Sequence, residues 1–239
     1  MSGVHRLRTP LAWALLLVTL MLLMPQLEGV FRLIAPDNRT LIYQRDSFAS
    51  LVVNHLMLVG VASLCAIVVG MGAAILVTRQ WGRDFLPLVG QLASIGQTFP
   101  PVAVLALAVP VLGFGSTPTI VALVLYGLLP IVRNTLVGIQ GINPGVMESA
   151  RGMGMSGRQI LWQVELPLAR PVILAGIRTS VTINIATAAI GSTIGARTLG
   201  DPIIAGIVNG NTAFILQGAL LIALLALCVD SLFERLQLR

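Results

Sequence analysis

The sequence predicts an all-α integral membrane protein with about six transmembrane helices. Of its 239 residues, 56% are hydrophobic and only 10% are charged, whereas an ordinary soluble domain carries roughly 25% charged residues. A chain with so few charges cannot cover a soluble surface. Because one span takes roughly 20 apolar residues, six spans would use most of the hydrophobic side chains and place them against membrane lipid. The mean hydropathy of +0.92 agrees with this class.

The first span is expected in the apolar run at residues 11–24, which follows a basic N-terminal segment. A secretory signal peptide has the same layout, but residues 25–28 offer no small-residue cleavage site. We therefore expect an uncleaved span. Residues 28–50 are mixed and polar and indicate an external loop.

Five further spans are expected in a core at residues 49–236, which follows the N-terminal span and loop at 1–48. Pro100 and Pro101 must break or kink the third span, and the polar pair Arg133-Asn134 is expected to end the fourth. The second span is expected at 51–77, and the third from 85 to a turn cluster at 113–118. The last three are expected at 119–132, 171–194 and 213–233.

The distribution of charge predicts the orientation. Six spans place both termini on one side of the membrane. If that side is the cytoplasm, the inner segments hold eleven Arg and five acidic residues, a balance of +6, and the outer segments hold four of each. Since basic residues favour the cytoplasmic side, we expect both termini there and a multi-pass protein of the inner membrane. The Arg residues form no basic stripe, so nucleic acid is not an expected partner.

All fifteen basic residues are Arg, and the sequence contains no Lys. The P-loop of nucleotide-binding proteins needs a Lys on the phosphates. The chain therefore has no Walker A site, and we expect it to be no enzyme and to hold no metal or cofactor.

Residues 138–170 form a polar loop that is expected to fold into two short helices. Asn143 followed by Pro144 is typical of a helix start, with the asparagine as the N-cap. Glycines at positions 152 and 154 are expected to stop this helix.

The second short helix is expected to begin at Ser156, because Gln159 completes a capping box three residues later. Ile160, Leu161 and Val164 would form its apolar side, and Leu166-Pro167 would end it. Two capped helices held beside the membrane indicate a surface that contacts something else.

The same loop carries a recognisable motif. Glu148-Ser149-Ala150, Gly154 and Val164-x-Leu166-Pro167 have the spacing E-A-A-x3-G-x9-I-x-L-P, and this pattern resembles the EAA loop of permease subunits of bacterial ABC importers. Ser149 and Val164 depart from it conservatively. The resemblance implies a type I permease core at 49–236 whose loop docks on a separate ATPase. The expected coupling residues are Glu148, Ala150, Gly152, Gly154, Met155, Ser156, Gly157, Arg158, Val164, Leu166 and Pro167.

The resemblance covers the chain from about Ser50 to Leu236 and is to the osmoprotectant branch, which imports glycine betaine, carnitine, choline and related quaternary amines. Within that branch it is to the second permease of a low-affinity betaine importer. It implies two copies of the ATPase, a second permease chain that is homologous or identical, and a periplasmic or lipid-anchored substrate-binding protein. Segment 198–201 departs from the usual G-G-L-G. The supporting segments are 97–101, 129–135, 152–156 and 175–179.

Quaternary amines are usually held by aromatic cages, and the sequence places no group of Trp and Tyr on the outer side. Tyr43 alone among these residues is expected near the outer surface. We therefore expect recognition to reside mainly on the external binding protein.

Polar residues inside the spans are candidates for a translocation path, because polar groups exposed to lipid are costly. Interhelical or interfacial hydrogen bonds explain these residues as well, and they are the favoured interpretation for the first two. The candidates are Asn54, His55, Asn184, Thr187, Ser192 and Thr193.

Two other classes of protein remain open at this point. A secondary transporter or channel would need an intramembrane acid, and the single candidate is Asp230, which a helix-end position near Arg235 also explains. An intramembrane protease would need Ser116 and His55 within hydrogen-bond reach. Co-purification with an ATPase would separate an importer from both classes.

Overall fold

A computed structural model describes residues 3–237, and the side chains of residues 9–237. Every regular element in this part of the chain is a helix. Five helical segments are long and apolar enough to span a membrane, and a bent pair of helices provides a sixth if it counts as one span. The predicted fold class is confirmed.

The N-terminal helices extend further than expected. α1 (Gly3–Leu23) continues through a 3₁₀ turn (Met24–Leu27) into α2 (Glu28–Ile34). The external loop expected at 28–50 is therefore wrong for residues 28–34. Phe31 packs into the core while Arg32 pairs with Glu28 at 2.6 Å. A short helix is stabilised here because one of its sides packs into the core and the other carries an ion pair between residues four positions apart.

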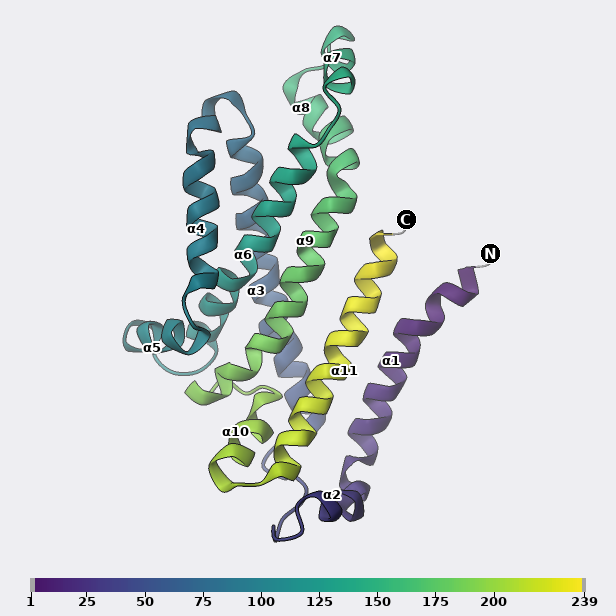
Figure 1. The fold of residues 1–239 in the computed structure, drawn as a ribbon, viewed down its shortest axis with the longest axis vertical. Coiled ribbons are helices and arrows are strands. Elements are labelled where there is room, and N and C mark those ends of the chain that lie inside the picture. Colours follow the sequence, from purple (N-terminus) through teal and green to yellow (C-terminus); the bar gives the residue numbers. More distant parts are fainter. Residues whose placement is uncertain (1–2, 238–239) are drawn as a thin grey trace.

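The second and third spans meet at a 3₁₀ segment (Gln80–Phe85). α3 (Phe48–Val77) precedes this segment and α4 (Leu86–Thr98) follows it. α5 (Pro101–Leu112) then leaves at 97° to α4, and Figure 1 shows it lying across the direction of the other long helices. The predicted break at Pro100-Pro101 is confirmed, because a proline disfavours helical geometry in the residue before it.

α6 (Ser116–Gln140) runs past Arg133 and Asn134, so the expected end of the fourth span is wrong. Arg133 is exposed. Asn134 donates its side-chain N–H to the carbonyl of Pro130 at 2.8 Å, which satisfies the amide within its own helix. Neither side chain therefore requires the helix to stop.

The 138–170 loop contains α7 (Pro144–Gly152) and α8 (Gly157–Ile160). A π-helical segment (Leu161–Glu165) joins α8 directly to α9 (Leu166–Thr187). The expectation that Leu166-Pro167 ends the helix is therefore wrong. The ring of a helical proline clashes with the carbonyl four residues earlier, which here lies in the π-helical segment, and the wider π turn accommodates it.

The last part of the chain holds a helix that the sequence did not predict. α9 continues as a 3₁₀ segment (Ala188–Ile194), and α10 (Gly200–Asn209) follows a short turn. Gly210, with φ +62°, ends α10. α11 (Thr212–Gln237) confirms the predicted sixth span and extends it at its C-terminal end.

Small residues allow α6 and α9 to pack closely, as is common between membrane helices. A Cβ atom on Gly176 of α9 would lie 2.6 Å from the carbonyl oxygen of Pro130. A Cβ atom on Gly127 of α6 would lie 2.6 Å from Ser180 Oγ. α3, α6 and α9 form the centre of the fold, and α1 packs on α11 at its side (Figure 1).

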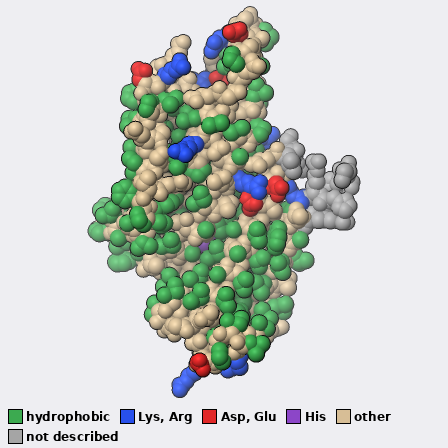
Figure 2. Space-filling model, in the orientation of Figure 1, with side chains coloured by type: hydrophobic (Ala, Val, Ile, Leu, Met, Phe, Trp, Pro, Cys, Tyr) green, Lys and Arg blue, Asp and Glu red, His purple; other side chains and the backbone are tan. Residues whose placement is uncertain are grey.

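The two ends of the bundle differ. α7 and α8 project at one end, here called the loop end, and the terminal ends of α1 and α11 point the same way (Figure 1). α2, α5 and α10 lie toward the opposite end, here called the far end. Figure 2 shows hydrophobic side chains over the flanks, charged side chains at the two ends, and a further group of positive and negative side chains between the ends. This distribution suits a helical bundle that crosses a membrane.

Candidate functional site

The 138–170 loop folds into the two capped helices that the sequence predicted. Asn143 Oδ1 accepts a hydrogen bond from the Gly145 N–H at 2.8 Å and caps α7. Within α7, Glu148 is exposed and Ala150 is buried. The capped helix therefore presents the Glu148 carboxylate outward while Ala150 packs against the protein.

α7 ends in a Schellman motif centred on Gly154. The Met155 N–H donates to the Ala150 carbonyl at 3.2 Å, and the Gly154 N–H donates to the Arg151 carbonyl at 2.9 Å. Gly154 has φ +77°, a conformation that favours glycine. Gly152, by contrast, is the last residue of the helix, so only Gly154 reverses the chain.

The predicted capping box is confirmed at the start of α8. The Gln159 N–H donates to Ser156 Oγ at 3.3 Å, and the Ser156 N–H donates to Gln159 Oε1 at 2.8 Å. Gly157 and Arg158 follow in the first turn of α8 and are exposed. The capping box thus fixes the direction in which this turn leaves the loop.

The loop exposes large apolar side chains. Met153 is 75% exposed and Trp162 is 63% exposed. The predicted apolar side of α8 instead faces the protein, because Ile160 is buried and Leu161 and Val164 are half-buried. Exposed apolar groups of this size beside short capped helices are typical of a protein contact surface.

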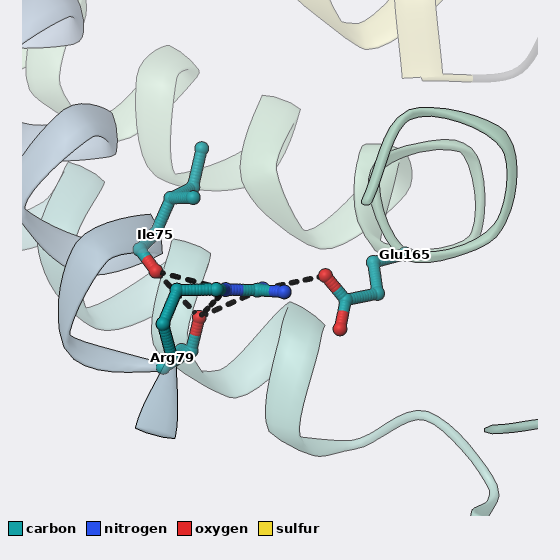
Figure 3. Close-up of polar contacts among 4 residues, drawn as sticks. Ile75, Arg79 and Glu165 are labelled. Atoms are coloured by element: carbon teal, nitrogen blue, oxygen red, sulfur yellow. Dashed lines mark hydrogen bonds and ion pairs between the residues drawn. The ribbon is translucent and has the colours of Figure 1, made fainter. Parts of the chain in front are cut away.

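An ion pair fastens this loop to the end of α3. Arg79 donates from Nη2 to Glu165 Oε2 at 2.5 Å, and the Glu165 side chain is only 7% exposed. Arg79 also donates from Nε to the Ile75 carbonyl at 3.3 Å. Figure 3 shows the guanidinium lying between that carbonyl and the carboxylate. Movement of the loop must therefore be shared with α3, or must break a largely buried pair.

Sequence reasoning missed this pair. Arg79 and Glu165 entered the prediction only in the count of charges on the cytoplasmic side, although Glu165 stands between Val164 and Leu166 of the motif. The two residues lie 86 positions apart, and no local pattern links them. Leu166 is half-buried and Pro167 is exposed at the start of α9.

His55 and Asn184, two of the candidate path residues, are buried between helices. His55 donates from Nε2 to the Ile185 carbonyl at 2.9 Å and accepts at Nδ1 from the Leu199 N–H at 3.3 Å. Asn184 donates to Ser63 Oγ at 3.2 Å, and its Oδ1 has no hydrogen-bond partner among the described residues. Both side chains connect α9 to α3.

The other candidate path residues do not share one wall. Asn54 lines a hollow of about 550 Å³ together with Ser116 and Arg197. Ser192 Oγ lies 2.8 Å from Thr198 Oγ1 and lines a second hollow of about 360 Å³. Thr187 is half-buried at the end of α9. Thr193 is exposed and donates to the Ile190 carbonyl.

The structure also bears on the two other classes of protein. Arg178 of α9 donates to both carboxylate oxygens of Asp230, each at 2.6 Å, so this acid is paired between two helices. A carboxylate held this way is not a free ion-coupling group. Both ring nitrogens of His55 are bonded to backbone groups, so this residue offers no base to Ser116.

Comparisons with known proteins agree with the motif. Residues 66–239 match the family described as binding-protein-dependent transport system inner membrane component. The chain belongs to this family. It is therefore a transport subunit, and a multi-pass protein of the inner membrane.

Relatives and solved structures extend this assignment. The osmoprotectant import permease protein OsmY of Salmonella typhimurium is 45% identical over 74% of this chain and 75% of the relative. The glycine betaine/carnitine/choline permease protein OpuCB of Bacillus subtilis is 40% identical over 74% and 80%. A chain of the MetNI methionine ABC transporter in an inward-facing conformation has a TM-score of 0.69 at 21% identity, over 79% of this chain and 94% of that chain. The last likeness shows the fold, a type I ABC importer permease.

Proposed function

We propose that this chain is the permease subunit of an ATP-driven importer and forms half of the translocation path for a small quaternary-amine osmoprotectant such as glycine betaine. The observation that carries the proposal is the combination of a capped, exposed 138–170 loop with relatives at 40–45% identity that are named osmoprotectant permeases.

ATP hydrolysis belongs to a separate subunit in this proposal. The chain has no Lys for a P-loop. Its loop instead offers α7, α8 and the exposed Met153 and Trp162 as a docking surface for an ATPase. Eight of the eleven expected coupling residues, from Glu148 to Arg158, lie in α7, α8 and the turn between them, and Val164, Leu166 and Pro167 lie in the π-helical segment and the start of α9. Each permease carries one such loop, so an importer with two permeases would bind two copies of the ATPase.

The remaining partners follow from the size of the path. Five or six spans enclose half of a path, so a second permease, identical or homologous, completes it. The termini and the 138–170 loop face the cytoplasm in this proposal, which the excess of Arg on that side supports. An external substrate-binding protein delivers the solute at the far end.

The decisive experiment is reconstitution. The permease and the ATPase are reconstituted in proteoliposomes whose lumen corresponds to the cytoplasm and contains ATP. The binding protein is added on the outside. Uptake of radiolabelled glycine betaine that requires both ATP and the binding protein supports the proposal. Uptake that continues without ATP and follows an ion gradient contradicts it and favours a secondary transporter.

A further inference from the structure

A small hollow of about 360 Å³ is lined by the segment before α3, by the 3₁₀ segment Ala188–Ile194 with the turn after it, and by α10. Figure 1 shows α10 toward the far end. Ligand sites commonly have volumes of about 300–1,000 Å³. The polar and aromatic side chains around this one are Tyr43, Arg45, Asp46, Ser192, Arg197, Asp201 and Asn209.

Charges of both signs line this hollow without neutralising each other closely. Arg197 approaches Asp46 no nearer than 3.9 Å, and the Arg197 side chain is 71% exposed. Within the described part of the chain, Arg45 and Asp201 form no ion pair. Elsewhere the same protein closes such pairs fully, as Arg178 and Asp230 do at 2.6 Å. The hollow therefore keeps two cations and two anions available.

Asp201 is held firmly in a partly buried position. Its N–H donates to the Thr198 carbonyl at 3.1 Å, and Thr198 Oγ1 accepts from the Gly200 N–H at 2.9 Å. Burial raises the pKa of the Asp201 carboxyl, although hydrogen bonds from Ser192 and the Thr198 backbone act in the opposite direction. A cation placed beside this carboxylate would restore part of the interaction that it has lost with water.

The wall of the hollow that contains Tyr43 is also held in place by hydrogen bonds and packing. The Tyr43 N–H donates to Gln217 Oε1 at 3.0 Å, and Gln217 Nε2 donates to the Leu41 carbonyl at 2.6 Å. The Tyr43 ring packs edge-on against Phe214, with 5.7 Å between the ring centroids. Because backbone and ring are both anchored to α11, this wall is organised before any ligand arrives.

We propose that this hollow is a low-affinity site for a zwitterion, in which Arg197 binds the carboxylate of the solute and Asp201, beside Tyr43, faces its quaternary ammonium group. The assignment rests on the proposed function and names a solute contact within it. A guanidinium binds a carboxylate through charge-assisted hydrogen bonds. A quaternary ammonium group donates no hydrogen bond and is attracted by anionic groups and aromatic rings.

The test measures binding to the importer in lipid nanodiscs without its binding protein. Ligand-observed NMR gives the Kd of glycine betaine, which has both charges, and of choline, which has no carboxylate. We expect millimolar binding of both. Arg197→Gln should weaken betaine binding about tenfold and choline binding less than twofold. Asp201→Asn should weaken both ligands. Arg39→Gln, which removes an exposed charge from the segment before α3, is the control and should change neither.

Three outcomes overturn the assignment: no saturable binding of betaine, an equal loss of both ligands in Arg197→Gln, or no change in that variant. A variant that binds both ligands normally but loses stimulation by the binding protein would identify the hollow as a protein-docking surface instead. Uptake by the wild-type importer is measured in parallel. Failure of ATP-dependent uptake contradicts the proposed function, whereas normal uptake with no binding in nanodiscs contradicts the site alone.

Discussion

Arg79 and Glu165 join the end of α3 to the π-helical segment of the 138–170 loop through a 2.5 Å ion pair. The pair links two segments that are far apart in sequence at the base of the surface proposed to meet the ATPase. A largely buried pair loses most when one partner is removed, because the other charge stays in a poorly hydrated place.

We expect Arg79→Ala to lower stability by about 3 kcal/mol, the lower end of the range for buried pairs, since Arg79 is partly exposed. It should also reduce betaine uptake relative to ATP hydrolysis. The Arg79→Ala/Glu165→Ala double variant should regain part of the stability. Thermal unfolding in detergent and the ratio of uptake to hydrolysis are the measurements. Arg83→Ala, an exposed neighbour, is the control, and equal effects in both Arg variants would argue against a role for the pair.

Gly154 provides the second prediction. A Cβ atom there would meet nothing within 4 Å, so the cost of a substitution comes from its φ of +77° alone. Gly154→Val should abolish uptake while the protein still inserts, because a left-handed conformation costs a residue with a Cβ about 1–2 kcal/mol and a β-branched one more. Gly154→Asn should retain most of the uptake. Normal uptake by the valine variant would contradict the prediction.

The third prediction concerns orientation. In a variant without Cys65 and Cys228, a cysteine at position 38 should react with a membrane-impermeant maleimide added to intact cells. A cysteine at position 157, which is exposed on the loop, should react only after permeabilisation. The excess of basic residues on one side is the physical reason. The reverse pattern of labelling would place the loop outside and rule out its contact with an ATPase.

His55 gives the fourth prediction. Its side chain is fully buried, and both ring nitrogens are bonded to backbone groups of other segments. His55→Ala should cost about 2 kcal/mol or more, because the Ile185 carbonyl and the Leu199 N–H lose their partner in the protein interior. We expect a lower unfolding temperature with an unchanged KM for solute-loaded binding protein in the folded fraction. A raised KM with unchanged stability would instead place His55 on the path.

The sequence was sufficient for elements whose causes are local. The break at Pro100-Pro101, the Asn143 cap and the Ser156–Gln159 capping box each depend on residues a few positions apart, and all three are present. Span ends were harder, because a polar residue such as Asn134 can satisfy itself within a helix.

Long-range features could not be predicted in the same way. Pro167 ends no helix because a π-helical segment precedes it, and Asp230 pairs with Arg178 rather than with Arg235. α10 is too short to be recognised as a membrane span, and its apolar residues form no separate run in the sequence. The sequence therefore did not indicate a helix there. The same limit holds for the hollow near Arg197, which three separate segments enclose. These features arise from packing between segments, and one sequence carries no record of which segments meet.

The last prediction separates recognition from translocation. Tyr43 is the one Trp or Tyr side chain that lines the hollow beside Arg197; it is buried, and its ring contacts Phe214 and Phe48. A full aromatic cage would need several ring faces within about 6 Å of the cation. The permease should therefore bind betaine only in the millimolar range, and rapid uptake should require the external binding protein. Solute-loaded binding protein should stimulate ATP hydrolysis more than empty binding protein does. Calorimetry on the purified permease measures the first expectation, and a micromolar Kd without any partner would show that the permease itself carries the specificity.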